Sequence, residues 1–222
     1  MNSTDLKSVF VVFDLDDTLY PERDYQRSGF EEICSRIKEL YQLDLSSDCA
    51  EWIKAGDADV LDKLCERAGL STRTKESLLW LYRLHRPRLA LHHEVRSVIE
   101  TLEVESAGVA ILTDGRSISQ RSKVQALGLG RLPTYVSEEI GCSKPHVSGF
   151  RRIERDFPAN RYVYVADNPA KDFVAPKTLG WRTIGIKGSA RNIHPQECDA
   201  LDSAYLPDVW VHSFSGLLKV MH

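Results

Sequence analysis

The residues best suited to chemistry are carboxylates, hydroxyls and lysines that follow short apolar runs. They lie at four places: Asp14 with Asp16, Thr113 with Asp114 and Gly115, Lys144, and Asp167 with Asp172. Clustered carboxylates repel one another unless a cation or a lysine offsets their charge. Hard oxygen ligands with few histidines suit Mg²⁺, which bridges readily to phosphate. A carboxylate nucleophile, a metal ion and a lysine together meet the demands of phosphoryl transfer for charge neutralisation and positioning.

Each of these groups has an ordinary structural explanation when it is taken alone. A D-x-D sequence after a strand can be a turn or a helix cap, and T-D-G is a common turn. Lys144 before Pro145 can be a surface lysine, and Asp167 and Asp172 can cap the helix that follows them. Their joint occurrence, each after an apolar run, favours one shared site.

The apolar runs predict the strands that would position these groups. Residues 9–13 are continuously β-branched or aromatic, which is typical of a strand buried on both faces of a parallel sheet. Further strands are predicted at 108–112, 135–136, 162–166, 183–186 and 209–211, and helices at 93–102, 119–127, 147–155 and 171–179. This alternation predicts an α/β fold, a Rossmann-like parallel sheet core flanked by helices. Such sheets bind ligands outside the carboxyl ends of their strands.

The stretch 20–88 departs from that alternation because it contains no convincing strand. It predicts four consecutive helices, at 25–41, 47–54, 60–68 and 73–85. In the first of these, apolar residues recur at a helical period. An all-helical block directly after the first strand of an α/β chain indicates an inserted module.

Composition excludes several classes of protein. The formal net charge is -3, so nothing in the overall charge predicts a nucleic-acid partner. The apolar run at 9–13 is too short for a signal peptide or a membrane span. The five cysteines are scattered, with no C-x-x-C pair. We therefore expect a protein of the reducing cytoplasm with free thiols and no membrane association.

The four motifs resemble those of the haloacid dehalogenase superfamily, and the resemblance covers nearly the whole chain. Asp14-Leu15-Asp16-Asp17-Thr18 is similar to its first motif, D-x-D-x-T. The resemblance implies that Asp14 is a nucleophile that forms an aspartyl-phosphate. It also implies that Asp16 is the general acid–base, which protonates the leaving alcohol and then activates water.

The other three motifs are recognisable by the same resemblance. Thr113 would hold the transferring phosphoryl group, with the backbone N–H groups of Asp114 and Gly115 nearby, and Lys144 would steady nucleophile and phosphate. The implied Mg²⁺ ligands are Asp14, the backbone carbonyl of Asp16, Asp167, and Asp172 directly or through water. The pattern Gln120, Lys123 and Leu127-Gly128-Leu129 echoes the phosphatase branch.

The resemblance also gives a domain organisation. Residues 1–19 and 89–222 would form the α/β catalytic core, and 20–88 would form a small all-helical cap domain. In such enzymes the cap closes over the core, excludes water and selects the leaving group. We therefore predict hydrolysis of a small phosphate monoester, such as a sugar phosphate or a nucleoside monophosphate.

Several alternatives stay open from the sequence. Asp16 makes dehalogenase chemistry improbable, because dehalogenases typically lack this second acid. A phosphoglucomutase-like phosphotransferase shares the same groups, and a non-catalytic protein that binds a phosphorylated ligand or a partner belongs to a different class. A phosphonate-cleaving relative would need a cap lysine, and Lys38, Lys54, Lys63 and Lys75 are interpreted as surface residues. The basic residues Arg83, His85, Arg86, Arg88, His92 and His93 could form an extra anion site for a sugar phosphate or nucleotide, but they are interpreted as solvating a hinge and a helix start. The sequence does not indicate an oligomeric state.

Overall fold

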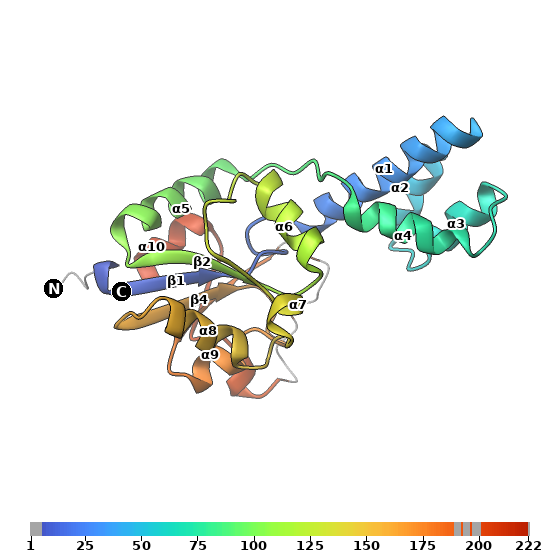
Figure 1. Cartoon of the computed structure of the whole chain (residues 1–222). Coiled ribbons are helices and arrows are strands. Elements are labelled where there is room, and N and C mark those ends of the chain that lie inside the picture. Colours follow the sequence, from blue (N-terminus) through green and yellow to red (C-terminus); the bar gives the residue numbers. More distant parts are fainter. Residues whose placement is uncertain (1–5, 189–191, 193–195, 197–200, 222) are drawn as a thin grey trace. The chain divides into compact units, whose positions relative to one another are not determined.

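The computed structural model describes residues 6–188, 192, 196 and 201–221. The chain divides into two compact units (Figure 1). The first comprises Met1–Glu22 and Ala90–His222, and the second comprises Arg23–Leu89.

The first unit is built on a parallel sheet. Its described strands are β1 (Val9–Phe13), β2 (Gly108–Thr113), β3 (Thr134–Val136), β4 (Arg161–Ala166), β5 (Arg182–Ile186) and β6 (Val209–Val211). They are all parallel, in the order β3-β2-β1-β4-β5-β6. The predicted α/β class is confirmed, and each expected strand is present.

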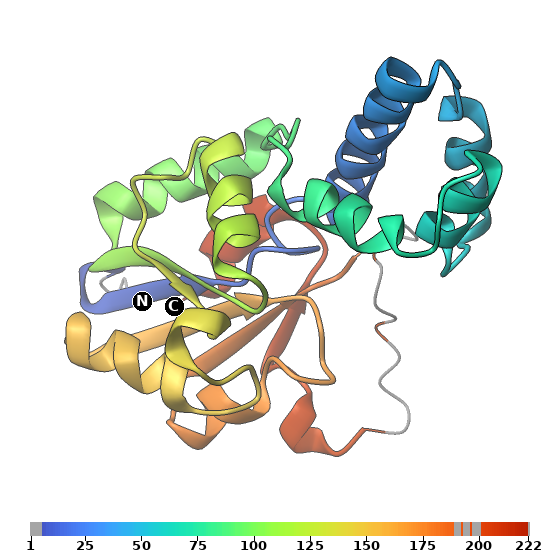
Figure 2. The same cartoon turned by 45° about the vertical axis from the view of Figure 1, so that its right-hand side comes forward.

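Helices cover both faces of this sheet. The described helices are α5 (His93–Glu105), α6 (Ser117–Ala126), α7 (Ser137–Ile140), α8 (Ser148–Asp156), α9 (Val174–Thr178) and α10 (Leu217–Val220), with 3-10 turns at Leu6–Ser8, Ser203–Tyr205 and Phe214–Gly216. Helices α5, α6 and α10 lie on one face and α8 and α9 on the other (Figures 1 and 2). The short helix α7 was not predicted. Helix α9 begins at Val174 rather than at 171, because Asp172 turns back to accept the N–H of Asn168.

Strand β1 shows why its sequence is apolar at every position. Phe10 and Val12 belong to a core cluster with Phe150 of α8 and Tyr164 of β4. Phe13 points to the opposite face of the strand and stacks on Phe214, with ring centroids 6.1 Å apart. Side chains of a strand alternate between faces, so a strand with helices on both faces must be apolar throughout.

The strand order places the carboxyl ends of β1 and β4 side by side. The Asp14 N–H, just beyond β1, donates to the carbonyl of Val165 at 2.9 Å. Connections from β1 lead to one side of the sheet, and the chain returns through β4 on the other side. A crevice forms where the order reverses in this way, and ligands of open α/β sheets bind there.

The second unit contains the four predicted helices. They are α1 (Glu22–Tyr41, whose first residue lies in the first unit), α2 (Ser46–Ala55), α3 (Val60–Arg67) and α4 (Thr74–Leu84). Their core is formed by buried apolar and thiol side chains: Ile33, Cys34, Ile37, Leu45, Cys49, Val60, Leu64, Cys65 and Leu78. Cys34, Cys49, Cys65 and Cys142 are free, and Cys198 lies outside the described residues.

Two expectations about charged residues of this unit are settled by contacts. Lys38, Lys63 and Lys75 form exposed or half-exposed ion pairs with aspartates, in keeping with surface positions. The interpretation of the whole run 83–93 as solvated is wrong at His85, which is buried. Its Nε2 lies 3.1 Å from the hydroxyl of Ser28 and its Nδ1 lies 2.6 Å from the Tyr82 carbonyl. Along the described part of the chain, no helix has the length and apolarity needed to cross a bilayer.

Candidate active site

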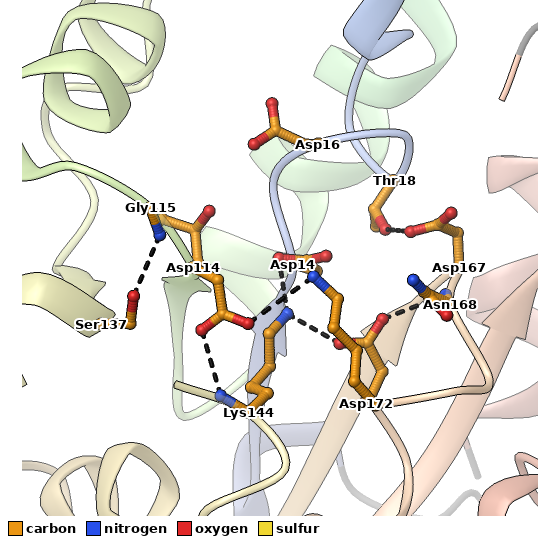
Figure 3. A network of polar contacts seen from close by, with 12 residues as sticks. Asp14, Asp16, Thr18, Asp114, Gly115, Ser137, Lys144, Asp167, Asn168 and Asp172 are labelled. Carbon is orange, nitrogen blue, oxygen red and sulfur yellow. Dashed lines mark hydrogen bonds and ion pairs between the residues drawn. The ribbon is translucent and has the colours of Figure 1, made fainter. Parts of the chain in front are cut away.

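Three buried carboxylates meet at the carboxyl ends of β1 and β4. Asp14 follows β1, and Asp167 and Asp172 lie on the loop between β4 and α9 (Figure 3). Their exposed fractions are 4%, 2% and 0%. One carboxylate oxygen of each lies within 4.8 Å of the others. These acids are separated by up to 158 positions in the chain, and the parallel β1–β4 pairing brings them together.

Lys144 provides a positive charge beside this group. Its ammonium lies 2.9 Å from Asp14 Oδ1 and 2.7 Å from Asp172 Oδ1, and 3.0 Å from the hydroxyl of Tyr164. Its backbone N–H donates to Asp114 Oδ1 at 3.1 Å. Burial alone would lower the pKa of Lys144, but Asp14 and Asp172 raise it well above its ordinary value. Lys144 is therefore charged and offsets one of three carboxylates.

The negative charge that Lys144 does not offset contributes to raised pKa values of two of the acids. Burial, opposed by Lys144 and aided by Asp172, raises the pKa of Asp14 to about 6. Burial and the charges of Asp14 and Asp172 raise the pKa of Asp167 to about 8. An additional cation would remove the repulsion behind both shifts. The donor set, three hard carboxylates without a histidine or thiolate, fits Mg²⁺.

Asp167 is also oriented by groups to which the sequence assigned no role. The Thr18 hydroxyl donates to Asp167 Oδ1 at 3.1 Å, and the Asn192 amide donates to Oδ2 at 3.2 Å. The Gln196 amide donates to the Asp167 carbonyl at 2.7 Å and to the Ile186 carbonyl at 2.8 Å. Nothing in the local sequence around Asn192 or Gln196 predicts these contacts, because both residues bind to Asp167, which is distant in the chain.

The Asp16 carboxylate is directed away from the three clustered acids (Figure 3). Lys123 lies 2.8 and 3.0 Å from its two oxygens, and Gln120 and Tyr20 donate to it. Burial raises the pKa of Asp16, but Lys123 and these hydrogen bonds outweigh it and hold the pKa below its usual range. In the sequence, Gln120 and Lys123 are recognised only as part of a motif of the phosphatase branch. Their three-residue spacing, which places both on one face of a helix, was the signal that could have indicated a role.

The predicted phosphate-binding residues are only partly brought together. Thr113 is 1% exposed, and its hydroxyl accepts a 2.6 Å hydrogen bond from the Gln120 amide. The Gly115 N–H instead donates to the hydroxyl of Ser137 at 3.0 Å. Figure 3 shows Gly115 facing Ser137. The cause is the unpredicted helix α7, whose first residue, Ser137, provides an acceptor there.

A cavity of about 210 Å³ opens over these groups. It is lined by Asp14, Asp16, Asp17, Glu22, Thr113, Asp114, Asp167, Asn168 and Lys171. Glu22, Asn168 and Lys171 were not predicted as site residues. Burial and the nearby Asp16 charge raise the pKa of Glu22 to about 7. The Lys171 ammonium lies 3.6 Å from Asp114 Oδ2.

Comparison with known proteins gives a consistent result. The family model for haloacid dehalogenase-like hydrolases matches residues 10–180. A glyceraldehyde 3-phosphate phosphatase of Methanocaldococcus jannaschii is 30% identical over 207 residues, covering 84% of this chain and 89% of that protein. A ribulose-1,5-bisphosphate 5-phosphatase of Halopiger xanaduensis is 28% identical, covering 87% and 88%. The magnesium-bound HAD-hydrolase YfnB of Bacillus subtilis has the same fold, with a TM-score of 0.65 at 15% identity over 97% of this chain and 99% of that one.

Proposed function

The chain belongs to the haloacid dehalogenase-like hydrolase family, and from this premise we propose that it is a magnesium-dependent phosphatase acting on a small sugar phosphate. The observation that carries the proposal is the placement of Asp14. Its carboxylate lies against the Lys144 ammonium, within reach of Asp167 and Asp172, and it lines the cavity.

In the first step Asp14 acts as the nucleophile. A carboxylate oxygen of Asp14 bonds to phosphorus, and the bond from phosphorus to the leaving oxygen breaks while that oxygen takes a proton from Asp16. Lys144 offsets the negative charge of the transferring phosphoryl group, and the Thr113 hydroxyl helps to position that group. A water oxygen then bonds to phosphorus, its proton passes to Asp16, and inorganic phosphate leaves Asp14.

Asp14, Asp167 and Asp172 would hold Mg²⁺, together with the backbone carbonyl of Asp16. When bound, the ion supplies positive charge to the phosphoryl oxygens and to the buried acids. The donor set and the raised pKa values of Asp14 and Asp167 support this assignment. A magnesium-bound protein of the same fold adds to the support.

The names of the relatives support sugar phosphates as the substrate class, since both are phosphatases of small phosphorylated sugars. We further propose that the helical unit, Arg23–Leu89, is the cap that selects the leaving group. The cavity of about 210 Å³ has room for a phosphoryl group.

The test is phosphate release from a panel that includes glyceraldehyde 3-phosphate, ribulose 1,5-bisphosphate, hexose phosphates and nucleoside monophosphates. We expect release with Mg²⁺, loss on chelation, and loss in Asp14→Asn. Glu105→Gln changes an exposed carboxylate of the first unit and is the matched control. Appearance of an isomeric sugar phosphate without inorganic phosphate would indicate phosphotransfer. Wild type as inactive as Asp14→Asn across the panel would overturn the proposal.

A further inference from the structure

The Asp16 carboxylate is surrounded by hydrogen-bond donors on both of its oxygens. Lys123 Nζ lies 2.8 Å from Oδ1 and 3.0 Å from Oδ2. The Gln120 amide donates to Oδ2 at 2.7 Å, and the Tyr20 hydroxyl donates to Oδ1 at 2.5 Å. Lys123 and Gln120 are 4% and 2% exposed and lie one turn apart on α6. The arrangement is therefore a built, buried site for a carboxylate.

These contacts fix the orientation of the Asp16 side chain. A carboxylate can accept hydrogen bonds on both oxygens. An ammonium, an amide and a hydroxyl are directed at it, so the carboxylate is held in one position beside the cavity. Resting on the proposed function, we propose that Lys123 is a positioning residue that holds Asp16 as the base for hydrolysis of the phosphorylated Asp14.

The burial of Lys123 indicates a role for its charge as well as for its packing. Taking an ammonium group out of water is costly unless a paired charge compensates for it. On the same helix Arg121 is half-exposed and pairs with Glu139, as a surface residue does. Lys123 instead reaches across 107 positions of sequence to the candidate acid–base.

Gln120 connects the same carboxylate to the phosphate side of the cavity. Its amide nitrogen also lies 2.6 Å from the Thr113 hydroxyl and 2.8 Å from the Asp114 carbonyl. Gln120 thereby fixes the position of Asp16 relative to Thr113, the residue proposed to contact the phosphoryl group. In the hydrolytic step the water oxygen bonds to phosphorus, its proton passes to Asp16, and the Asp14–phosphorus bond breaks with its electrons returning to Asp14. Lys123 exchanges no proton.

The test separates the two chemical steps with 2,4-dinitrophenyl phosphate, whose leaving group departs without protonation. In rapid mixing with Mg²⁺, we expect Lys123→Met to complete the first turnover within about threefold of the wild-type rate and to fall about 100-fold in steady state. The result is a burst approaching one dinitrophenolate per enzyme, with phosphorylated Asp14 accumulating. Lys123→Arg should restore much of the steady-state rate. Lys219→Met, an exposed lysine on α10, should leave both phases unchanged.

Three outcomes would overturn the inference while the proposed function stands: equal loss of both phases, an effect confined to KM, or no effect. Lys123→Met should cause no further loss when added to Asp16→Asn, since it acts through that carboxylate. Lys123→Gln, which keeps a donor but lacks the charge, replaces Lys123→Met if circular dichroism shows that the latter is unfolded. Wild type that releases no dinitrophenolate would instead overturn the proposed function.

Discussion

Lys144 and Asp14 form an ion pair in which both side chains are almost fully buried. The Lys144 ammonium lies 2.9 Å from Asp14 Oδ1, and the side chains are 2% and 6% exposed. In water such a pair contributes little, but in the interior each partner depends on the other for compensation. The pair joins the end of β1 to the segment that follows α7, so it contributes to both stability and the proposed chemistry.

The first prediction concerns Lys144→Met. Removing the ammonium leaves Asp14 and Asp172 buried without their shared cation, so the free energy of unfolding of the metal-free protein should fall by about 3 kcal/mol at neutral pH. Urea unfolding measures the loss, with Lys219→Met as an exposed lysine control. The deficit should shrink near pH 5, where protonation neutralises Asp14. Equal stability of the variant and wild type would contradict a charged role for Lys144.

The second prediction concerns pH and Mg²⁺. The pKa of Asp14 is raised to about 6 and that of Asp167 to about 8, both from 3.8. At a pH between its unfolded and its folded pKa, each of these acids binds more protons in the folded protein than in the unfolded chain. The stability of the metal-free protein should therefore fall as pH rises from about 4 to about 8. Mg²⁺ offsets the ionised acids, so it should raise Tm more at pH 8 than at pH 5. Thermal unfolding with Mg²⁺ or EDTA tests this, and an equal rise at both pH values would refute it.

The third prediction concerns Asp167→Asn. An amide keeps the shape of Asp167 and removes its charge, so repulsion from Asp14 and Asp172 disappears. At pH 8 we expect the metal-free variant to be more stable than wild type by on the order of 1–2 kcal/mol. The same variant should lose the Tm response to Mg²⁺ and its phosphate release. Glu105→Gln should keep both, and a retained Mg²⁺ response in Asp167→Asn would remove this residue from the proposed ligands.

The fourth prediction concerns the sheet. A Cβ added to Gly185 of β5 would lie 2.3 Å from Trp210 Cε3 and 2.7 Å from Pro207 Cγ, so the ring must shift. Gly185→Ala should reduce the free energy of unfolding by about 1–3 kcal/mol. At Gly216 the nearest atom to an added Cβ lies at 3.6 Å, and Gly216→Ala should stay within about 0.5 kcal/mol. Chemical denaturation of both variants measures the contrast, and similar losses would count against the packing of Trp210.

Local patterns were sufficient to predict the strands of the sheet and the order of the candidate site residues along the chain. The run 9–13 is apolar at every position because both faces of β1 are covered, and that condition is visible in the sequence itself. Asp14 directly follows this run, so its position at a carboxyl end followed at once. The predicted first residues of helices were less accurate. Helix α9 begins later than predicted because the Asp172 carboxylate accepts a hydrogen bond from the Asn168 N–H, and hydrophobic periodicity does not encode such a contact.

The sequence by itself determined the α/β class, the helical insertion and the residues that could carry phosphoryl transfer. Only the tertiary structure decided how those residues are paired. Lys123 lies 107 positions from Asp16, and the Gly115 amide meets Ser137 rather than the cavity. The physical reason is that strand and helix patterns depend on neighbours a few residues away. Pairing at the sheet end depends instead on crossover connections and side-chain directions, which are defined once the strands have assembled.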